Sequence, residues 1–255
     1  AKEGPQLLFM DSPGVTAVLI QEQGKTALYV HDSRSFAADL PVSRGLKSAL
    51  VARSITTIDV LIISHDGLRQ LPAWQAAPFT IGQVIAGGTV PDAHNGGISG
   101  LRLLPCHPPR QLTWDSLTFH FWQDQRKGLS EPARSCVVRL ESQVLSGDIL
   151  LSGDIGREGE RRLLGWLGNP ASIAGLLAPS GGRQGSSQAG WVQQIDPQWV
   201  VFTAVPDPQV LDRYRLQGSQ WWYPGEHGAV QLQQGQELPR GFREGAPFWW
   251  RRPLH

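Results

Sequence analysis

Cysteine is scarce in this chain, which has only Cys106 and Cys136. The two form no C-x-x-C pair, and no histidine accompanies them at the spacing typical of zinc sites, so a cysteine-based zinc motif is excluded. Two alternatives remain for the pair. The cysteines form a disulfide if the domain lies outside the cytoplasm, or they are two buried free thiols.

Long hydrophobic runs and net charge are lacking as well. No stretch approaches the roughly 18 apolar residues that a membrane-spanning helix needs, so no transmembrane segment is predicted within the chain. The net charge is +1, which gives no strong overall field for nucleic acid or an anionic membrane. Lysine is rare, with 4 residues against 19 arginines. Arginine suits bidentate contacts to phosphate, but a GC-rich genome produces the same bias.

Short apolar segments and turn residues are abundant instead. Hydrophobic residues make up 40% of the chain and charged residues 18%, which is typical of a globular protein. The apolar run at 60–64 predicts a strand buried on both faces, and the spacing of leucines predicts an amphipathic helix over 157–168. Segments 91–99 and 180–188 are rich in glycine and small polar residues, which indicates loops.

The predicted elements alternate along the chain in a way that two packed sheets would satisfy. Strands are expected at 7–10, 16–21, 26–31, 60–64, 83–86, 101–104, 117–122, 135–140, 149–152, 199–203, 220–223 and 228–232, and helices at 41–53, 157–168 and 207–216. Two sheets packed face to face with helices outside fit this order. The pattern alone therefore predicts an α/β or α+β domain and nothing finer.

Five segments, in the same order, resemble the metallo-β-lactamase-like domain of ComEC-type competence proteins. They are FMDSPGVTAVLIQ at 9–21, LIISHDGLRQL at 61–71, WDSLTFHF with ARSCVVRL at 114–121 and 133–140, ILLSGDIGREGERRLL at 149–164, and LLAPSGGRQGSS with HGAV at 176–187 and 227–230. The resemblance implies a metallo-β-lactamase-like αββα sandwich over residues 1–235, followed by an irregular aromatic and basic tail over 236–255. It also implies a disulfide between Cys106 and Cys136, because similar domains tend to carry this pair.

The stretch that corresponds to the family's metal loop departs from the family pattern. In that family a His-x-His-x-Asp-His loop follows a buried strand, and its side chains hold one or two metal ions with a position open for water. Here residues 64–70 are SHDGLRQ, and only His65 stands at a ligand position. Arg69 replaces a carboxylate and Gln70 replaces the last histidine. A guanidinium about 4 Å from a cation, at an effective dielectric constant near 20, costs roughly 4 kcal/mol per unit of charge product.

The ligand positions further along the chain are changed too. The family's Pro-His-His-Gly loop is matched by PSGG at 179–182, and a later Gly-His-Pro by PDP at 206–208. Asp154 is retained and resembles the family's bridging carboxylate. The resemblance therefore implies a vestigial site of His65, Asp66, Asp154 and Asp207, in which His65, Asp154 and Asp207 are weak metal candidates. No metal or other cofactor is expected; the alternative is Mn²⁺ or Zn²⁺.

Structural roles compete with these site assignments. Asp66 is expected to act as a turn residue or to pair with Arg69, and Asp154 is expected to be a turn or cap carboxylate near the following helix. Histidines elsewhere in the chain rebuild a site only if the fold brings them close to it. The candidates are His31 with Asp32, His94 and His227.

Arginine and tryptophan supply the candidate nucleic-acid contacts. Base stacking beside phosphate-binding arginine is one interpretation of the dense clusters, and core packing with a solvated basic helix face is the other. The candidate residues are Arg69, Arg157, Arg161, Arg183, Trp249, Trp250, Arg251 and Arg252.

The resemblance implies a function that the net charge does not independently support. It implies a non-membrane domain of a DNA-uptake channel protein, at the periplasmic face of the inner membrane, whose partners are single-stranded DNA and the membrane channel portion of the same parent protein. With most ligands replaced, we expect little or no hydrolase activity and a guiding or scaffolding role. The enzyme alternative is a metal-dependent nuclease or phosphodiesterase, and a third is a protein-interaction module that retains only the fold.

Overall fold

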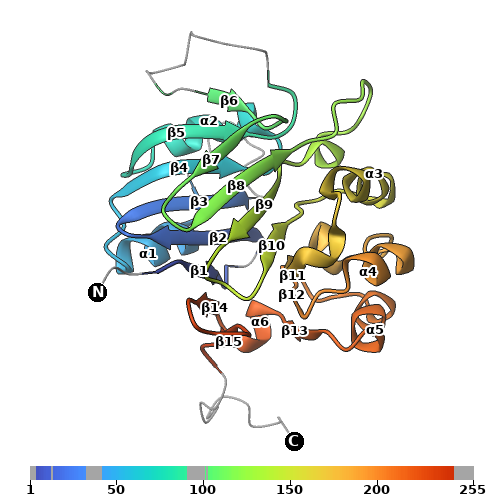
Figure 1. Ribbon diagram of the computed structural model, residues 1–255. Helices are drawn as coiled ribbons and strands as arrows, with labels where there is room; N and C mark the ends of the chain where they lie inside the picture. The colour runs from blue at the N-terminus through green and yellow to red at the C-terminus, as the bar shows by residue number, and fades with distance from the viewer. Residues whose placement is uncertain (1–3, 13, 33–41, 91–100, 102, 244–255) are drawn as a thin grey trace, which may run out of the picture.

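Two mixed β-sheets pack face to face, and helices cover the outer face of each sheet (Figure 1). This is a computed structural model, and it describes residues 4–12, 14–32, 42–90, 101 and 103–243. The four layers confirm the predicted αββα sandwich. Within the described part, no helix has the length and apolar character needed to cross a bilayer.

The first sheet has eight strands, and most of its order follows the chain. From edge to edge the strands are β15 (Arg240–Gly241), β14 (Val230–Gln233), β1 (Gln6–Phe9), β2 (Val15–Glu22), β3 (Lys25–Asp32), β4 (Thr57–Ile63), β5 (Thr80–Ala86) and β6 (Leu103–Pro105). Strands β1 to β3 form the expected antiparallel meander, and β3 to β6 run parallel. The parallel strands end at the same edge of the sheet, and this edge carries the candidate site.

The second sheet has seven strands. In order they are β13 (Gln220–Trp222), β12 (Trp199–Val201), β11 (Ile173–Leu177), β10 (Asp148–Leu151), β9 (Val137–Ser142), β8 (Leu117–Trp122) and β7 (Gln111–Thr113). Strands β10 to β13 are parallel to one another, whereas β7 to β10 are antiparallel. As in the first sheet, the parallel half presents the carboxyl ends of its strands at one edge.

The helices fall into two groups, one for each sheet, with a short single-turn helix between strands. Helices α1 (Arg44–Ala52) and α2 (Gly67–Gln75) pack on the eight-stranded sheet. Helices α3 (Arg157–Leu167), α4 (Ala189–Ile195) and α5 (Pro208–Leu216) pack on the seven-stranded sheet, and α6 (Pro224–His227) follows β13. Each group buries an apolar stripe, so both sheets are covered on both faces, which explains the continuous apolar runs in the sequence.

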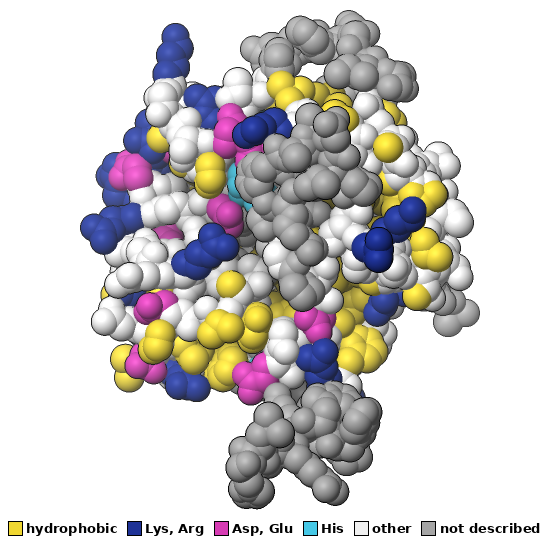
Figure 2. Space-filling view, turned by 180° about the vertical axis from the view of Figure 1, so that it is seen from behind, with side chains coloured by type: hydrophobic (Ala, Val, Ile, Leu, Met, Phe, Trp, Pro, Cys, Tyr) yellow, Lys and Arg dark blue, Asp and Glu magenta, His cyan; other side chains and the backbone are white. Residues whose placement is uncertain are grey.

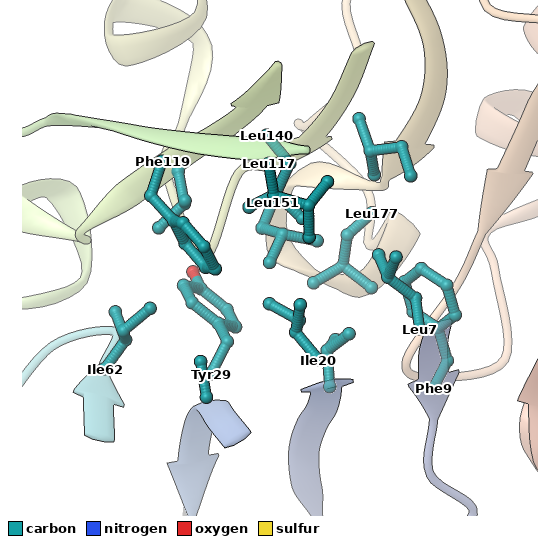
Figure 3. Packing of buried hydrophobic residues seen from close by; sticks show 14 of the residues in the cluster. Leu7, Phe9, Ile20, Tyr29, Ile62, Leu117, Phe119, Leu140, Leu151 and Leu177 are labelled. Atoms are coloured by element: carbon teal, nitrogen blue, oxygen red, sulfur yellow. The ribbon is translucent and has the colours of Figure 1, made fainter. Parts of the chain in front are cut away.

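The main core lies between the sheets. Side chains from the first sheet, including Ile20, Tyr29 and Ile62, point toward Phe119 and Leu151 of the second (Figure 3). All of these side chains are almost completely removed from solvent. Alternate residues of the same strands face the outer helices, so β3 sends Tyr29 inward while its neighbours in sequence pack under α1 and α2.

Strand β11 and helix α4 are among the elements that the sequence analysis did not predict, and the structure shows why. Strand β11 is Ile-Ala-Gly-Leu-Leu, with little β-branched content, and its Gly175 is required because a Cβ there would lie 2.0 Å from the Trp199 ring. Helix α4 has no capping side chain of its own at Gln188. The carboxylate of Glu160 in α3 accepts from the backbone N–H groups of Ser187 and Gln188 instead. A cap supplied from another helix leaves no local signal.

The segment expected to be an irregular tail from residue 236 contains a short strand. Strand β15 pairs with β14 and extends the eight-stranded sheet at Arg240 and Gly241. Phe242 also donates its backbone N–H to Ala229. Residues 244–255 lie outside the described residues.

Candidate metal centre and cleft

Three potential metal ligands converge where the parallel strands end. His31 lies in β3, His65 follows β4, and Asp154 follows β10 of the other sheet. One ligand atom from each of the three side chains lies within 4.8 Å of the others. The group lines a cleft of about 530 Å³ between the two sheets, whose other walls come from the start of β2 and the loops after β11, β12 and β13. Because β3 and β4 are parallel neighbours, their ends bring His31 beside His65.

His65 is held in the orientation of a ligand. The Ser135 hydroxyl lies 2.7 Å from the Pro132 carbonyl, to which it donates, so the Ser135 oxygen accepts from the His65 Nδ1–H at 3.3 Å. The proton on Nδ1 leaves a lone pair on Nε2. That Nε2 lies 3.8 Å from an Asp66 oxygen and 3.9 Å from an Asp154 oxygen. Burial, with a smaller effect of His31, lowers the pKa of His65 to about 3, so the ring is neutral at physiological pH.

His31 stacks on His65 with ring centroids 3.8 Å apart, but its hydrogen bonding differs. The Gln70 amide nitrogen lies 2.9 Å from the His65 carbonyl and 3.1 Å from His31 Nδ1. A carbonyl only accepts, so the atom facing it must be the NH₂ group, and the same NH₂ donates to His31 Nδ1. In a neutral ring the proton then sits on Nε2, and this nitrogen has no lone pair to offer a metal.

Asp66 and Arg69 occupy the rim of this group. Asp66 adopts a left-handed backbone conformation (φ 53°, ψ 33°) immediately before α2, and its side chain is buried. Its carboxyl makes no capping hydrogen bond to α2. Burial and the nearby Glu131 raise the pKa of Asp66, against the opposing effect of Arg69. The Arg69 side chain is 63% exposed, with Nη1 4.0 Å from an Asp66 oxygen, so the expected pairing with Arg69 occurs. The expected acceptance of backbone N–H groups at the start of α2 does not.

Asp154 and Asp207, the two remaining acidic candidates, lie in different places and have different roles. Asp154 was expected to be a turn or cap carboxylate, but the N-cap of α3 is Gly156 and no side chain caps that helix. Asp154 instead points toward His65. Asp207 is the N-cap of α5, where its carboxylate accepts from Gln209 and Val210 N–H groups. Asp207 is absent from the ligand group and from the cleft lining, so its assignment as a metal candidate is replaced by a capping role.

The other predicted residues are spread over the molecule. Arg183 lines the cleft with Ser180, and Arg157 and Arg161 lie on α3. His227 accepts from the Tyr223 N–H and packs edge-on against Trp221 at a separate groove. The aromatic and basic residues of the tail, and one histidine, lie outside the described residues; they are Trp249, Trp250, Arg251, Arg252 and His94.

A disulfide and a tyrosine lie directly behind the site. Cys106 and Cys136 are joined, as the resemblance implied, and they connect the end of β6 to the start of β9 across the two sheets. The Tyr29 hydroxyl donates to the Cys136 carbonyl, and the Cys136 N–H donates to the Ser64 carbonyl. Ser135, which holds both His65 Nδ1 and the Asp154 N–H, is therefore anchored by its neighbour Cys136.

These residues do not fit the family's metal centre. His65 presents a lone pair and Asp154 a carboxylate, but His31 presents an N–H under the Gln70 hydrogen bond. A catalytic zinc site has three protein ligands and an open position, and within the described residues two donors are correctly protonated for that role. Sequence reasoning placed His31 only within conceivable reach. Its position at the end of the strand next to β4 is the signal that could have selected it.

Comparisons with known proteins agree with this architecture. No family model matches the chain. It is 24% identical over 253 residues to competence protein ComA of Neisseria gonorrhoeae, covering 93% of this chain and 34% of that protein. It is also 29% identical over 125 residues to the uncharacterized protein YcaI of Escherichia coli K12, covering 46% of this chain and 16% of that protein. The chain thus spans about a third or less of the length of these curated relatives.

Solved structures give the fold. The metallo-β-lactamase fold protein YhfI from Bacillus subtilis has a TM-score of 0.51 at 12% identity, covering 89% of this chain and all of that one. A mutant of the CmlA beta-hydroxylase has a TM-score of 0.52 at 12% identity, covering 90% of this chain and 54% of that one. The chain therefore has the metallo-β-lactamase fold, and over most of its length its sequence is similar to that of competence protein ComA.

Proposed function

We propose that this chain is a catalytically degenerate, non-membrane domain of a DNA-uptake channel protein, and that it guides or scaffolds single-stranded DNA at the extracytoplasmic side of the membrane. The similarity to a competence protein supports the setting. The Gln70 amide supports the loss of catalysis, since it donates to His31 Nδ1 and so opposes metal binding at the third convergent position.

The disulfide supports the extracytoplasmic location. Disulfides persist in oxidising compartments and are rare in the cytosol, and the Cys106–Cys136 bond is completely buried in the core between the sheets. The membrane channel portion of the parent protein is the expected partner for a domain of this kind.

A second function is favoured by one observation, the convergence of His31, His65 and Asp154 within 4.8 Å. On this alternative the domain is a metal-dependent nuclease or phosphodiesterase with one Mn²⁺ or Zn²⁺. His65 and Asp154 would hold the ion, and the Gln70 amide would have to turn away so that His31 could join them. A bound divalent ion would supply a Lewis acid and an activated water.

The test compares cleavage of labelled single-stranded DNA in the presence of Mn²⁺ by the wild type and by Asp154→Ala. Asp212→Ala is the matched control, because Asp212 is exposed on α5, away from the cleft, and pairs with Arg215 three residues further along the helix. Degeneracy predicts no cleavage by any of the three proteins. Cleavage by the wild type and the control that disappears in Asp154→Ala would refute degeneracy and establish the metal-dependent alternative.

Calorimetric titration with Zn²⁺ gives a readout that does not depend on activity. The wild type is expected to bind Zn²⁺ weakly or not at all, and Gln70→His, which restores a family-type imidazole, is expected to bind it more tightly. Tight binding by the wild type that Asp154→Ala abolishes would contradict the proposed degeneracy. If the wild type neither cleaves nor binds single-stranded DNA at low salt, where phosphate contacts are strongest, the guiding role fails and a protein-interaction module remains.

A further inference from the structure

Cationic side chains from three segments gather on one side of the molecule, over α3 and the connection between β8 and β9. Figure 2 shows the dark-blue side chains along the left of the view, where α3 lies. We name this the α3 basic face, and it consists of Arg126, Lys127, Arg134, Arg157, Arg161 and Arg162. We propose that the α3 basic face binds the phosphate backbone of single-stranded nucleic acid and leads it to the cleft. This inference rests on the proposed guiding function and assigns the surface that performs it.

A buried carboxylate holds two of these guanidinium groups in place. The Asp124 side chain is 1% exposed and accepts from Arg126 Nε at 3.1 Å and from Arg126 Nη2 at 2.8 Å. Arg162 Nε lies 3.4 Å from the same carboxylate. Binding a polyanion to side chains that are already ordered loses less rotamer entropy than binding to free ones, so Asp124 prepares this part of the face for a ligand.

Glu158 extends the ordered network along α3. Its carboxylate lies 2.7 Å from Arg161 Nη2 and 3.4 Å from Arg126 Nη1. The side chains nevertheless remain accessible, since Arg161 is 73% exposed, Arg162 46% and Arg126 38%. Each guanidinium carries five N–H donors in a planar fork that matches phosphate oxygens. Arg161 uses Nε and Nη2 for Glu158, which leaves the two N–H groups of Nη1 and one of Nη2 for a phosphate.

The charge balance of the α3 basic face favours an anionic partner. Its six cations are accompanied by four acidic side chains, namely Asp124, Glu131, Glu158 and the buried Glu160, which also interacts with Arg157. The face therefore carries an excess of two positive charges, whereas the whole chain has a net charge of +1.

The α3 basic face adjoins the cleft. Helix α3 starts three residues after Asp154, and Pro132, which begins the short helical turn that carries Arg134, lines the cleft. Arg183 also lines the cleft, together with Asp154. A strand whose phosphates follow Arg161 and Arg157 along one side of α3, four residues apart, reaches the cleft at the helix N-terminus.

A nucleic acid fits this surface better than a lipid bilayer does. Membrane-surface helices insert large apolar side chains beside their cations. Among the described residues, the large exposed hydrophobic side chains lie elsewhere, at Val51, Leu68, Val144, Val205, Leu216 and Phe242. The face presents ordered guanidinium groups without an apolar component, as expected for contacts to a phosphate backbone.

The test measures the binding of a fluorescent oligothymidylate to the chain by anisotropy at several salt concentrations. Arg161→Glu/Arg162→Glu reverses two cations of the face, and Arg44→Glu/Lys47→Glu makes the same charge change on exposed residues of α1. We expect at least a tenfold weaker Kd for the first variant and less than a threefold change for the second. The slope of log K against log salt should become shallower by about 0.7 for each lost phosphate contact.

The possible outcomes distinguish this inference from the function on which it rests. Wild-type binding that neither variant changes, or that both variants weaken equally, overturns the α3 basic face and leaves DNA guidance standing. No binding by the wild type at low salt overturns the guidance function itself. Binding to phosphatidylserine vesicles that Arg161→Glu/Arg162→Glu abolishes, while DNA binding is unaffected, assigns the face to a membrane and also overturns the inference. A single cooperative transition in thermal unfolding confirms that each variant folds.

Discussion

Tyr29 connects the two sheets directly behind the candidate site, and its hydroxyl can be removed with little other change. The side chain is fully buried, and the hydroxyl lies 2.9 Å from the Cys136 carbonyl and 3.1 Å from Ser64 Oγ. One hydroxyl has one proton, so Tyr29 donates to the carbonyl and accepts from Ser64. Burial raises the pKa of Tyr29 far above its usual value, so the donor persists at all pH values of interest.

Tyr29→Phe deletes this hydroxyl and leaves the buried Cys136 carbonyl with one partner fewer. A buried polar group that loses its hydrogen-bond partner costs about 1–3 kcal/mol, and we expect the free energy of unfolding to fall by that amount. Urea unfolding followed by tryptophan fluorescence measures it, because several of the ten tryptophans are buried.

Tyr214→Phe is the matched control for this experiment. Tyr214 is also fully buried, but it lies on α5 in the core between the outer helices and the seven-stranded sheet. Its hydroxyl lies 2.9 Å from the Ser187 hydroxyl rather than from a backbone carbonyl. We expect a loss of about 1 kcal/mol for this variant. If Tyr29→Phe costs less than about 0.5 kcal/mol, a size typical of neutral surface substitutions, the hydroxyl does not stabilise the contact between the sheets.

Three further predictions concern residues that the fold places in specific roles. Asp124→Asn should destabilise the protein by about 1–3 kcal/mol at neutral pH. Although burial opposes ionisation, the hydrogen bonds from Arg126 keep the pKa of Asp124 low, so the difference in melting temperature between variant and wild type should shrink as the pH falls below about 4. A difference that does not change with pH would show that the charge of Asp124 is not the cause. Glu160→Ala should lower the free energy of unfolding by about 2 kcal/mol or more, because two backbone N–H groups at the start of α4 lose their acceptor. Amide hydrogen exchange should become faster in α4, and unchanged protection there would contradict the prediction. Gly175→Ala should cost about 1–3 kcal/mol through overpacking against Trp199, whereas Gly190→Ala, at an open position within α4, should be neutral or stabilising in thermal melts.

The sequence by itself determined most of the fold. The apolar run at 60–64 predicted a strand buried on both faces, and β4 occupies Thr57–Ile63 between β3 and β5. The leucine spacing of α3 predicted an amphipathic helix at 157–168, and the helix ends at Leu167. Such elements can be predicted because apolar side chains recur along the chain with the period of the helix or strand whose face they bury. Resemblance then supplied the αββα arrangement that periodicity could not.

Only the tertiary structure decided the composition of the candidate site. His65 and Asp154 were selected from the sequence, but His31 joins them because β3 and β4 end at the same sheet edge. Asp207 does not belong to the group, because it is the N-cap of α5 and its carboxylate is used by the backbone of that helix. The sequence could not predict the protonation of the two histidines either. Their lone pairs depend on Gln70, which approaches from α2, and on Ser135, which approaches from the turn before β9. Contacts between residues far apart in the chain carry no periodic signal, so the sequence names the candidates and the packing of the sheets decides which of them meet.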